Sequence, residues 1–342
     1  MKKTLCLALQ SFSWLYTALI LAWFAAYLLG GDNLPYLGLA NLLAVYFFAP
    51  LPLVLLAGLL CRRQALLLGF AAGLLIFLGL WGRVFTPRLS PAQAEGPRLR
   101  VMTFNVLAWH NFTAPLLEVI RQEDPDVLFI QELNPALALA LEGELGQVYP
   151  YRQLEPAGNP SGIGTLSKHP FTPVAGGGEL PGQGWIGGPL LAEMEWQGQR
   201  VTLVNFHMLP TTGVYGGERT ARDFRVRAEQ ARLLAELAQN GPAILAGDAN
   251  SVPTSDAYQI LTAGLQDAWA EAGWGLGHTF PGSSTSPGSD RPRLGGLAVP
   301  PWLARIDYIF CTQDWEVLSA RLARVDGVSD HRGVVAELSL AR

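Results

Sequence analysis

The stretch AILAGDANSVP (residues 243–253) begins as an apolar strand and ends abruptly in Gly-Asp-Ala-Asn. A short apolar run bounded by turn-forming residues is typical of a strand buried inside a sheet. Side chains two positions apart in an extended chain point to the same side, so Asp248 and Asn250 are expected to project together. A carboxylate and a carboxamide aimed at one point indicate a polar site at the end of this strand.

The same pattern, an apolar run followed by a polar residue, recurs along the chain from residue 99 onward. Each such residue on its own has a structural explanation, such as a strand-end cap or a buried histidine that has found a partner. Together they supply four carboxylates, two carboxamides and two imidazoles for one end of the sheets. The residues are Asn105, Glu132, His207, Asp248, Asn250, Asp307, Asp330 and His331.

The secondary-structure signals around these residues predict many strands and a few covering helices. Gln197-Gly198 lies between two alternating runs and predicts a hairpin turn, while residues 219–239 carry apolar side chains at helical spacing. Such a chain is expected to fold as an α/β class protein. The predicted architecture is a four-layer α/β sandwich, with two packed mixed β-sheets flanked by helices.

The first part of the chain has a different composition. Half of all residues are hydrophobic, and the excess gathers in three apolar stretches, residues 5–29, 36–60 and 65–81, which predict three transmembrane helices. A cleaved signal peptide is disfavoured, because the first stretch is too long and two more follow it. The predicted division is a membrane domain over residues 1–85, a Pro-rich linker over 86–98 and a catalytic domain over 99–342.

Basic residues predict how these helices lie in a membrane. Lys2 and Lys3 precede the first stretch, and Arg62 and Arg63 separate the second from the third. The positive-inside rule then places these ends in the cytoplasm and, after three spans, the catalytic domain outside it. The prediction is a multi-pass cell-membrane protein with an extracytoplasmic catalytic domain, although Arg83 argues the other way.

Charge and cysteine content narrow the function classes further. Seven of the 24 Lys/Arg and two of the 28 Asp/Glu precede residue 99, which leaves 17 basic and 26 acidic residues, a net charge of −9. An acidic domain is a poor general binder of nucleic acid, so none is expected as a partner. Cys311 is the sole cysteine of that domain, which excludes an internal disulfide there.

The polar residue set is suited to phosphate chemistry. Glu132, with Asn105 and Asp330 close by, offers the hard oxygen ligands that Mg²⁺ prefers, and Mn²⁺ or Ca²⁺ would also suit them. The two histidines could contact a phosphoryl oxygen or hold a proton. Water attack on phosphorus needs such parts, which predicts a metal-dependent phosphoric ester hydrolase.

At these residues the chain resembles the endonuclease/exonuclease/phosphatase family, which includes DNase I and the neutral sphingomyelinases. The resemblance covers about residues 99–340, and GDAN and SDH carry its most specific motifs. It implies that Glu132 is the principal metal ligand with Asn105 beside it, and that His207 contacts the scissile phosphate. It also implies that Asp248 and Asn250 orient the water and the phosphoryl group, and that Asp307 holds His331. Whether Asp248 or His331 accepts the proton stays open, with Asp248 preferred.

The predicted membrane helices favour a lipid substrate. Three such helices before this domain are similar to the layout of membrane phosphatases linked to glycopeptide resistance. Two loops, residues 211–224 and 294–304, look suited to a bilayer surface, and His278 and Trp302 are candidate substrate contacts. The expected reaction cleaves a phosphomonoester, phosphodiester or pyrophosphate bond in a membrane lipid. An extracytoplasmic nuclease is the alternative, and an inactive lipid-binding module is disfavoured because every core motif is present.

Overall fold

The computed structural model describes residues 2–34, 36–86, 96–109, 112–174, 184–211, 217–283, 291–294 and 296–341. Most of the predicted linker, residues 87–95, lies outside the described residues, as do residues 212–216 of the first predicted bilayer-facing loop. Within the described part, helices occupy the chain up to Phe85 and the first strand begins at Leu99.

Two six-stranded sheets form the centre of the molecule, and each mixes parallel with antiparallel neighbours. The order in the first sheet is β13 (Trp315–Leu322), β14 (Val334–Leu340), β1 (Leu99–Asn105), β2 (Val127–Gln131), β4 (Ile163–Ser167) and β3 (Tyr151–Glu155). The order in the second is β5 (Phe171–Pro173), β6 (Gly187–Trp196), β7 (Gln199–His207), β8 (Ala243–Asp248), β12 (Asp307–Cys311) and β9 (Gln266–Asp267).

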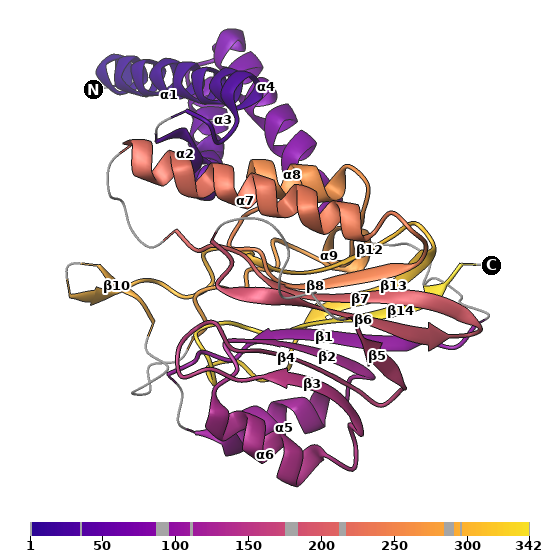
Figure 1. Cartoon of the computed structure of the whole chain (residues 1–342). Coiled ribbons are helices and arrows are strands. Elements are labelled where there is room, and N and C mark those ends of the chain that lie inside the picture. Colours follow the sequence, from indigo (N-terminus) through magenta and orange to yellow (C-terminus); the bar gives the residue numbers. More distant parts are fainter. Residues whose placement is uncertain are drawn as a thin grey trace.

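Helices cover the outer face of each sheet, so that the molecule has four layers (Figure 1). The first sheet is covered by α5 (Thr113–Glu123) and α6 (Pro135–Leu145), and the second by α7 (Gly217–Leu237) and α8 (Asp256–Thr262). The short helix α9 (Ala268–Ala272) packs against β12 and β13, and the small hairpin of β10 (Arg293–Leu294) and β11 (Leu297–Ala298) projects from one end.

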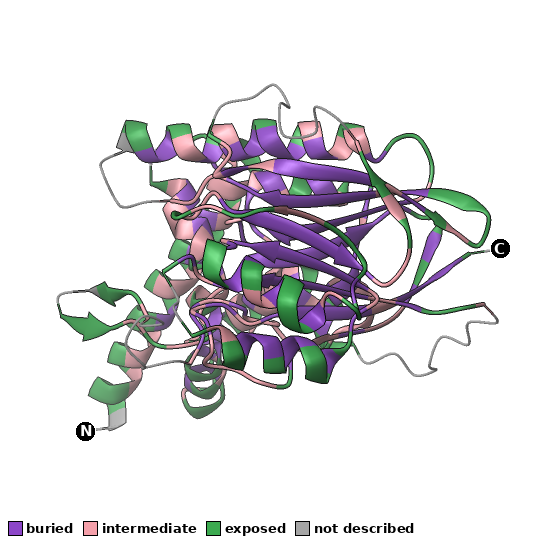
Figure 2. Cartoon of the chain, turned by 60° about the horizontal axis from the view of Figure 1, so that its bottom comes forward, coloured by how far each residue is buried: buried purple, intermediate pink, exposed green. Residues whose placement is uncertain are grey.

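Apolar burial holds these layers together. Strands β2, β4, β8 and β12 are buried along their whole length, as the central purple strands of Figure 2 show. Separate apolar clusters fill the space between each sheet and its helices and the space between the two sheets. The predicted sandwich is therefore confirmed, together with the Gln197-Gly198 hairpin, in which Trp196 pairs with Gln199.

The N-terminal region corrects one prediction. Residues 36–60 were expected to form one continuous transmembrane helix, but they form α2 (Leu37–Leu42), the 3₁₀ helix η1 (Ala44–Phe48) and α3 (Leu51–Leu60). Pro50 and Pro52 at the start of α3 explain the break, because proline cannot donate the backbone hydrogen bond that a continuing helix needs. Among the described helices, two are long and apolar enough to cross a membrane. One is α1 (Lys2–Gly30), and the other is α4 (Gln64–Trp81) with the short η2 that continues it.

A disulfide joins Cys6 of α1 to Cys61 at the end of α3, with the two Cα atoms 5.8 Å apart. It brings the basic residues at both places to one end of the helical group. The opposite ends reach the sandwich, since Asp32 follows α1 and Arg83 lies in η2 (Gly82–Phe85), and both contact residues there. The path therefore runs toward the sandwich, away from it and back again.

Candidate active site

Strand register brings three of the predicted residues side by side in the second sheet. His207 ends β7 and pairs with Asp248, because β7 and β8 run parallel. Asp307 begins β12 and also pairs with Asp248, because β12 runs antiparallel to β8. The ends of β7 and β8 and the start of β12 thus lie at one edge of the sheet, with the strand of Asp248 between the strands of His207 and Asp307.

The first sheet delivers the remaining residues to the same edge. Asn105 ends β1 beside the end of β2, and Glu132 follows β2 directly. Strand β14 is antiparallel to β1, so the Asp330-His331 pair before it also arrives at the end of β1. The strand-end arrangement expected from the sequence is what the topology produces.

Asp248 links the two sheets at the end that carries these residues. Its Oδ2 accepts a hydrogen bond from Asn105 Nδ2 at 3.1 Å, and it lies 3.5 Å from His207 Nε2 and 3.8 Å from His331 Nε2. Its Oδ1 accepts the backbone N–H of Asn250 at 2.8 Å. The carboxylate is 1% exposed, so these partners replace water around it.

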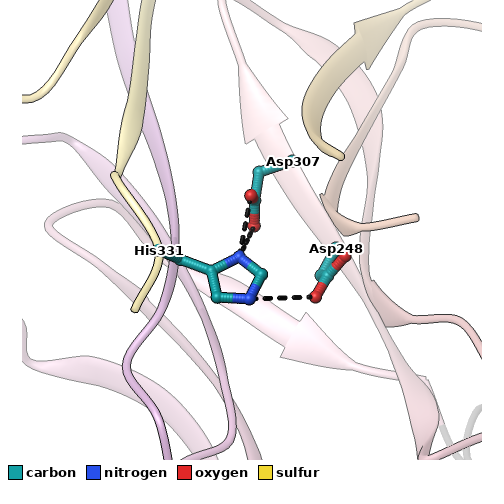
Figure 3. Close-up of side chains that lie close together, drawn as sticks. All are labelled: Asp248, Asp307 and His331. Carbon is teal, nitrogen blue, oxygen red and sulfur yellow. Dashed lines mark hydrogen bonds and ion pairs between the residues drawn. The ribbon is translucent and has the colours of Figure 1, made fainter. Parts of the chain in front are cut away.

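His331 lies between two carboxylates (Figure 3). Its Nδ1 faces Asp307 Oδ2 at 2.9 Å and Oδ1 at 3.2 Å, while its Nε2 points to Asp248. Burial alone would lower the pKa of His331, but the charges of Asp307 and Asp248 outweigh it and hold that pKa well above its usual value. His331 is therefore an imidazolium at neutral pH, with Nδ1–H donated to Asp307.

The other two titratable groups are shifted differently. Burial and the charge of Asp307 together raise the pKa of Asp248 to about 7, against the opposing effect of His331. Burial lowers the pKa of His207 to about 4, so its ring is neutral at pH 7. A group whose pKa lies near the working pH is best suited to accept a proton, which favours Asp248 over the protonated His331 as the base.

Glu132 lies on the other side of Asn105. Asn105 Nδ2 donates to Glu132 Oε1 at 3.2 Å, and the backbone N–H of Ala108 donates to Glu132 Oε2 at 2.9 Å. Asn105 Oδ1, the atom that would bind a metal, accepts the N–H of Leu107 at 3.1 Å, and the role of Asn105 as a metal ligand stays a prediction. In this arrangement Asn105 bridges Glu132 and Asp248 through its amide nitrogen.

Two groups of side chains here are suited to a divalent ion. Asp248, Asp307 and His331 each offer one ligand atom within 4.8 Å of the others, and His331 would bind an ion only in its neutral form. Glu132 and Asp330 supply further carboxylates, and they are close enough that Glu132 raises the pKa of Asp330, an effect that adds to burial and is opposed by His331. Oxygen-rich, partly buried donors of this kind fit Mg²⁺, Mn²⁺ or Ca²⁺.

Backbone strain marks the same strand ends. Glu132 has φ of 60° and Asn250 has φ of 48°, both in the left-handed region that side chains other than asparagine or glycine seldom adopt. Asn250 is held there by a bond from its Nδ2 to the carbonyl of Met208, 3.0 Å away. Outliers of this kind gather at functional sites, where the surrounding fold maintains them.

The two predicted substrate residues lie beside this cluster. His278 Nδ1 contacts the carbonyl oxygen of Trp302, and the His278 ring lies against Tyr46 of η1. His278 also lines a cavity of about 550 Å³ between the N-terminal helices and the sandwich. The Trp302 side chain donates to Asp326 at 2.8 Å and is about half exposed. Neither residue makes a described contact with the catalytic carboxylates.

Sequence reasoning missed three residues that orient the cluster. Ser329 donates to the carbonyl oxygen of Asn105 at 2.8 Å and accepts the N–H of His331 at 3.1 Å. Thr279 accepts the N–H groups of Ile306 and Asp307. The ring of Phe280 packs on His331, with 4.9 Å between ring centroids. These residues lie within or beside the SDH and GHTF stretches of the sequence. Their roles were not predictable, because a hydroxyl that bonds to a backbone group leaves no signal in the sequence.

Comparison with known proteins agrees with this geometry. A family model described as Endonuclease/Exonuclease/phosphatase family matches residues 102–331. No curated protein sequence matches the chain. Among solved structures, zebrafish (D. rerio) TDP2 complexed with single-strand DNA product is similar at 17% identity, covering 71% of this chain and 99% of that one, with a TM-score of 0.54.

Two further structures share the fold. The human Nocturnin catalytic domain with bound sulfate anion matches at 20% identity over 72% of this chain and 96% of that one, with a TM-score of 0.52. A family protein from Bacteroides vulgatus matches at 20% identity over 72% of this chain and 100% of that one, with a TM-score of 0.51. At these identities the likeness concerns the fold.

Proposed function

The chain belongs to the endonuclease/exonuclease/phosphatase family and is a metal-dependent phosphoester hydrolase, and from this premise we propose that its substrate is a membrane lipid. The observation that carries the proposal is the attachment of the catalytic sandwich to two long apolar helices, α1 and α4. They are about 43 Å and 27 Å long at 1.5 Å per residue, enough to reach across or nearly across a hydrocarbon core of about 30 Å.

Orientation follows from the ends of these helices. The end that carries Lys3, Arg62 and Arg63 is distal to the sandwich, because the Cys6–Cys61 disulfide holds these residues together while the opposite helix ends contact the sandwich. The positive-inside rule assigns that end to the cytoplasm, so the sandwich faces the outer side.

The disulfide itself argues for the reverse orientation, because disulfides persist in oxidising compartments. Protease added to intact cells decides: cleavage in the sandwich supports the outer location, and full protection refutes it.

The acidic character of the sandwich favours lipid over nucleic acid. A net charge of −9 from residue 99 onward opposes the cationic phosphate contacts that sustain nucleic-acid affinity. A lipid phosphate is delivered instead by the bilayer in which the helices are anchored. Because the anchor confines enzyme and substrate to one surface, affinity for the free headgroup is not required.

The proposed reaction uses the protonation states of the site. A divalent ion held by Glu132 and its neighbours would offset the charge that develops on the phosphoryl oxygens. Asp248 accepts the proton of the attacking water, which Asn250 helps to orient. The imidazolium of His331, fixed by Asp307, donates a hydrogen bond to a phosphoryl oxygen, and the neutral ring of His207 donates another from Nε2.

A substrate panel tests the proposal. The full chain, purified in detergent with Mg²⁺, is assayed on an isoprenoid pyrophosphate, sphingomyelin, phosphatidylglycerol, a phosphomonoester lipid and plasmid DNA. Turnover of one lipid class at a rate well above that of DNA supports the proposal and also identifies the bond that is cleaved. The Glu132→Ala variant is the matched control, since contaminating activity would persist in it.

A nuclease is the second candidate, because one of the similar structures, that of zebrafish TDP2, contains a single-strand DNA product. A nuclease of this fold would bind its substrate through basic groups near the site. DNA cleavage without turnover of any lipid in the panel would establish the nuclease and refute the lipid proposal.

A further inference from the structure

The loop between α1 and α2 makes an unusual contact with the catalytic sandwich. Asp32 Oδ2 accepts the backbone N–H of Asp256 at 2.9 Å, and Asp256 Oδ2 accepts the backbone N–H of Asp32 at 3.0 Å. Two segments 224 residues apart thus exchange a pair of hydrogen bonds. Asp32 is 2% exposed and Asp256 is half-buried, so this contact is partly shielded from solvent.

Asn41, in helix α2, extends the contact. Its Nδ2 donates to Asp32 Oδ1 at 2.8 Å, its Oδ1 accepts from Trp23 Nε1 at 3.1 Å, and its carbonyl accepts from Thr254 Oγ1 at 2.7 Å. Asn41 and Thr254 are 1% and 3% exposed. Every polar atom named here has a partner, which is the condition under which a buried polar network fixes one arrangement.

The segment that Asp32 and Asn41 contact also carries the proposed catalytic residue Asn250. Residues 249–255 connect β8 to α8, and Asn250 lies six residues before Asp256, the first residue of α8. From the sandwich side, Ser255 Oγ accepts the N–H of Val252 at 3.2 Å, and Tyr308 donates to the carbonyl of Ser251 at 2.8 Å. At the other end of this segment, Thr254 and Asp256 are held by Asn41 and Asp32 of the N-terminal region.

A second set of contacts joins the N-terminal helices to the sandwich. The hydroxyl of Tyr46 in η1 donates to the carbonyl of Leu303 at 2.9 Å, four residues before Asp307. Arg83 of η2 pairs with Glu271, and the backbone of Val84 accepts the N–H of Gly275 at 2.7 Å. The buried side chains of the N-terminal helices join one apolar cluster with those between the two sheets. The helices are therefore packed onto the sandwich and are more than a tether.

We propose that Asp32 and Asn41 are positioning residues, which hold residues 249–256 and thereby keep Asn250 in its reactive arrangement. The N-terminal helices then belong to the catalytic unit as well as anchoring it. The inference rests on hydrolysis at the proposed site but is independent of the substrate being a lipid. Displacing a reacting group by about 1 Å can cost about 100-fold in rate, so a loosened segment is expected to lower kcat.

The test uses the full chain in detergent with Mg²⁺ and the soluble diester bis(p-nitrophenyl) phosphate, so that access to a bilayer does not limit the rate. Asp32→Ala and Asn41→Ala remove the network, and Thr254→Val removes one hydroxyl while keeping the side-chain shape. Tyr16→Phe is the matched control, because it deletes a bond within the helices, from Tyr16 to the carbonyl of Phe47 at 2.9 Å. Amide hydrogen exchange over residues 249–262 is measured in parallel.

We expect kcat to fall at least about 10-fold in Asp32→Ala and Asn41→Ala with KM within about 2-fold, a loss of about 1.4 kcal/mol in transition-state stabilisation. Exchange over residues 249–262 should become about 10-fold faster, and Thr254→Val should shift both quantities in the same direction. Tyr16→Phe should leave both unchanged.

Wild-type kcat together with wild-type exchange in the first two variants would overturn the inference. Amide exchange reports how firmly residues 249–262 are held even in the absence of turnover. The exchange measurement therefore tests the inference whether the diester is cleaved or not. A wild-type chain that cleaves the diester and no lipid would refute the proposed substrate while leaving this inference intact.

Discussion

Replacing Asp307 by asparagine tests the assignment of His331 as a fixed imidazolium. The substitution keeps the size of the side chain but removes the charge that lies 2.9 Å from His331 Nδ1. Both side chains are nearly inaccessible, at 6% and 0% exposure, so solvent does not screen the pair. Without the charge of Asp307 the pKa of His331 falls, because burial lowers this pKa and Asp307 is the main charge that raises it.

The expected loss follows from that contact. A hydrogen bond to a charged group contributes about 1.5–3 kcal/mol, which corresponds to a fall in kcat of about 10- to 150-fold. Removing one partner of a buried ion pair costs about 3–5 kcal/mol of stability, an upper bound here because His331 can lose its proton instead. The assay is steady-state hydrolysis of the soluble diester with Mg²⁺, with thermal unfolding measured on the same preparations.

Glu123→Gln is the matched control for Asp307→Asn. Glu123 is a buried carboxylate on α5, 1% exposed, that pairs with Arg321 at 2.5 Å and makes no described contact with Asp307 or His331. This variant should lower thermal stability and leave kcat within about 2-fold of wild type. If Asp307→Asn behaved as the control does, losing stability but not kcat, the proposed role of the Asp307–His331 pair would be refuted.

Three further predictions concern the same cluster. Glu132→Gln should raise the Mg²⁺ concentration for half-maximal activity by about 10- to 100-fold, measured by metal titration, and an unchanged titration would remove Glu132 from the metal site. Asp248→Asn cannot accept a proton and should lower kcat by about 100-fold or more with KM nearly constant, whereas a wild-type kcat would exclude Asp248 as the base. In EDTA-treated protein, the raised folded-state pKa of His331 contributes stability that is complete below about pH 6.5 and is lost as pH rises through that pKa. Denaturant unfolding between pH 6 and 10 should therefore show a decline in stability that is shallower in His331→Gln, and equal slopes would contradict the shift.

The sequence predicted the parts of the site that depend on strand periodicity. Asp248 and Asn250 could be paired by their spacing, and residues such as His207 could be placed at strand ends because apolar runs stop there. Register then brings His207, Asp248 and Asp307 side by side. The sandwich was predictable for the same reason, since alternating and continuous apolar runs report local burial.

Features that depend on distant pairing were not predictable in this way. The reciprocal contact of Asp32 with Asp256 joins residues 224 positions apart, and neither position carries a local signal of it. The Cys6–Cys61 disulfide was hidden because Cys6 lies within, and Cys61 directly after, an apolar stretch interpreted as a membrane span. The break at Pro50 could have been found, since proline inside a helical run marks a boundary, but overall hydropathy outweighed it.

The orientation of Asn105 shows a further limit. A carboxamide can present either its oxygen or its nitrogen, and sequence does not distinguish them. Here the Leu107 N–H occupies the oxygen, which turns the nitrogen toward Glu132 and Asp248. The chemistry of a residue was thus predictable from its type, whereas its role depends on the neighbours that the fold supplies.

The most direct test of the lipid proposal is a competition in one vessel. The full chain in mixed micelles with Mg²⁺ is given plasmid DNA together with the membrane lipids of the panel, and both phosphate-ester products are quantified over time. We expect lipid turnover that is abolished in Glu132→Ala, with DNA left intact. Cleavage of DNA while every lipid remains unchanged would contradict it.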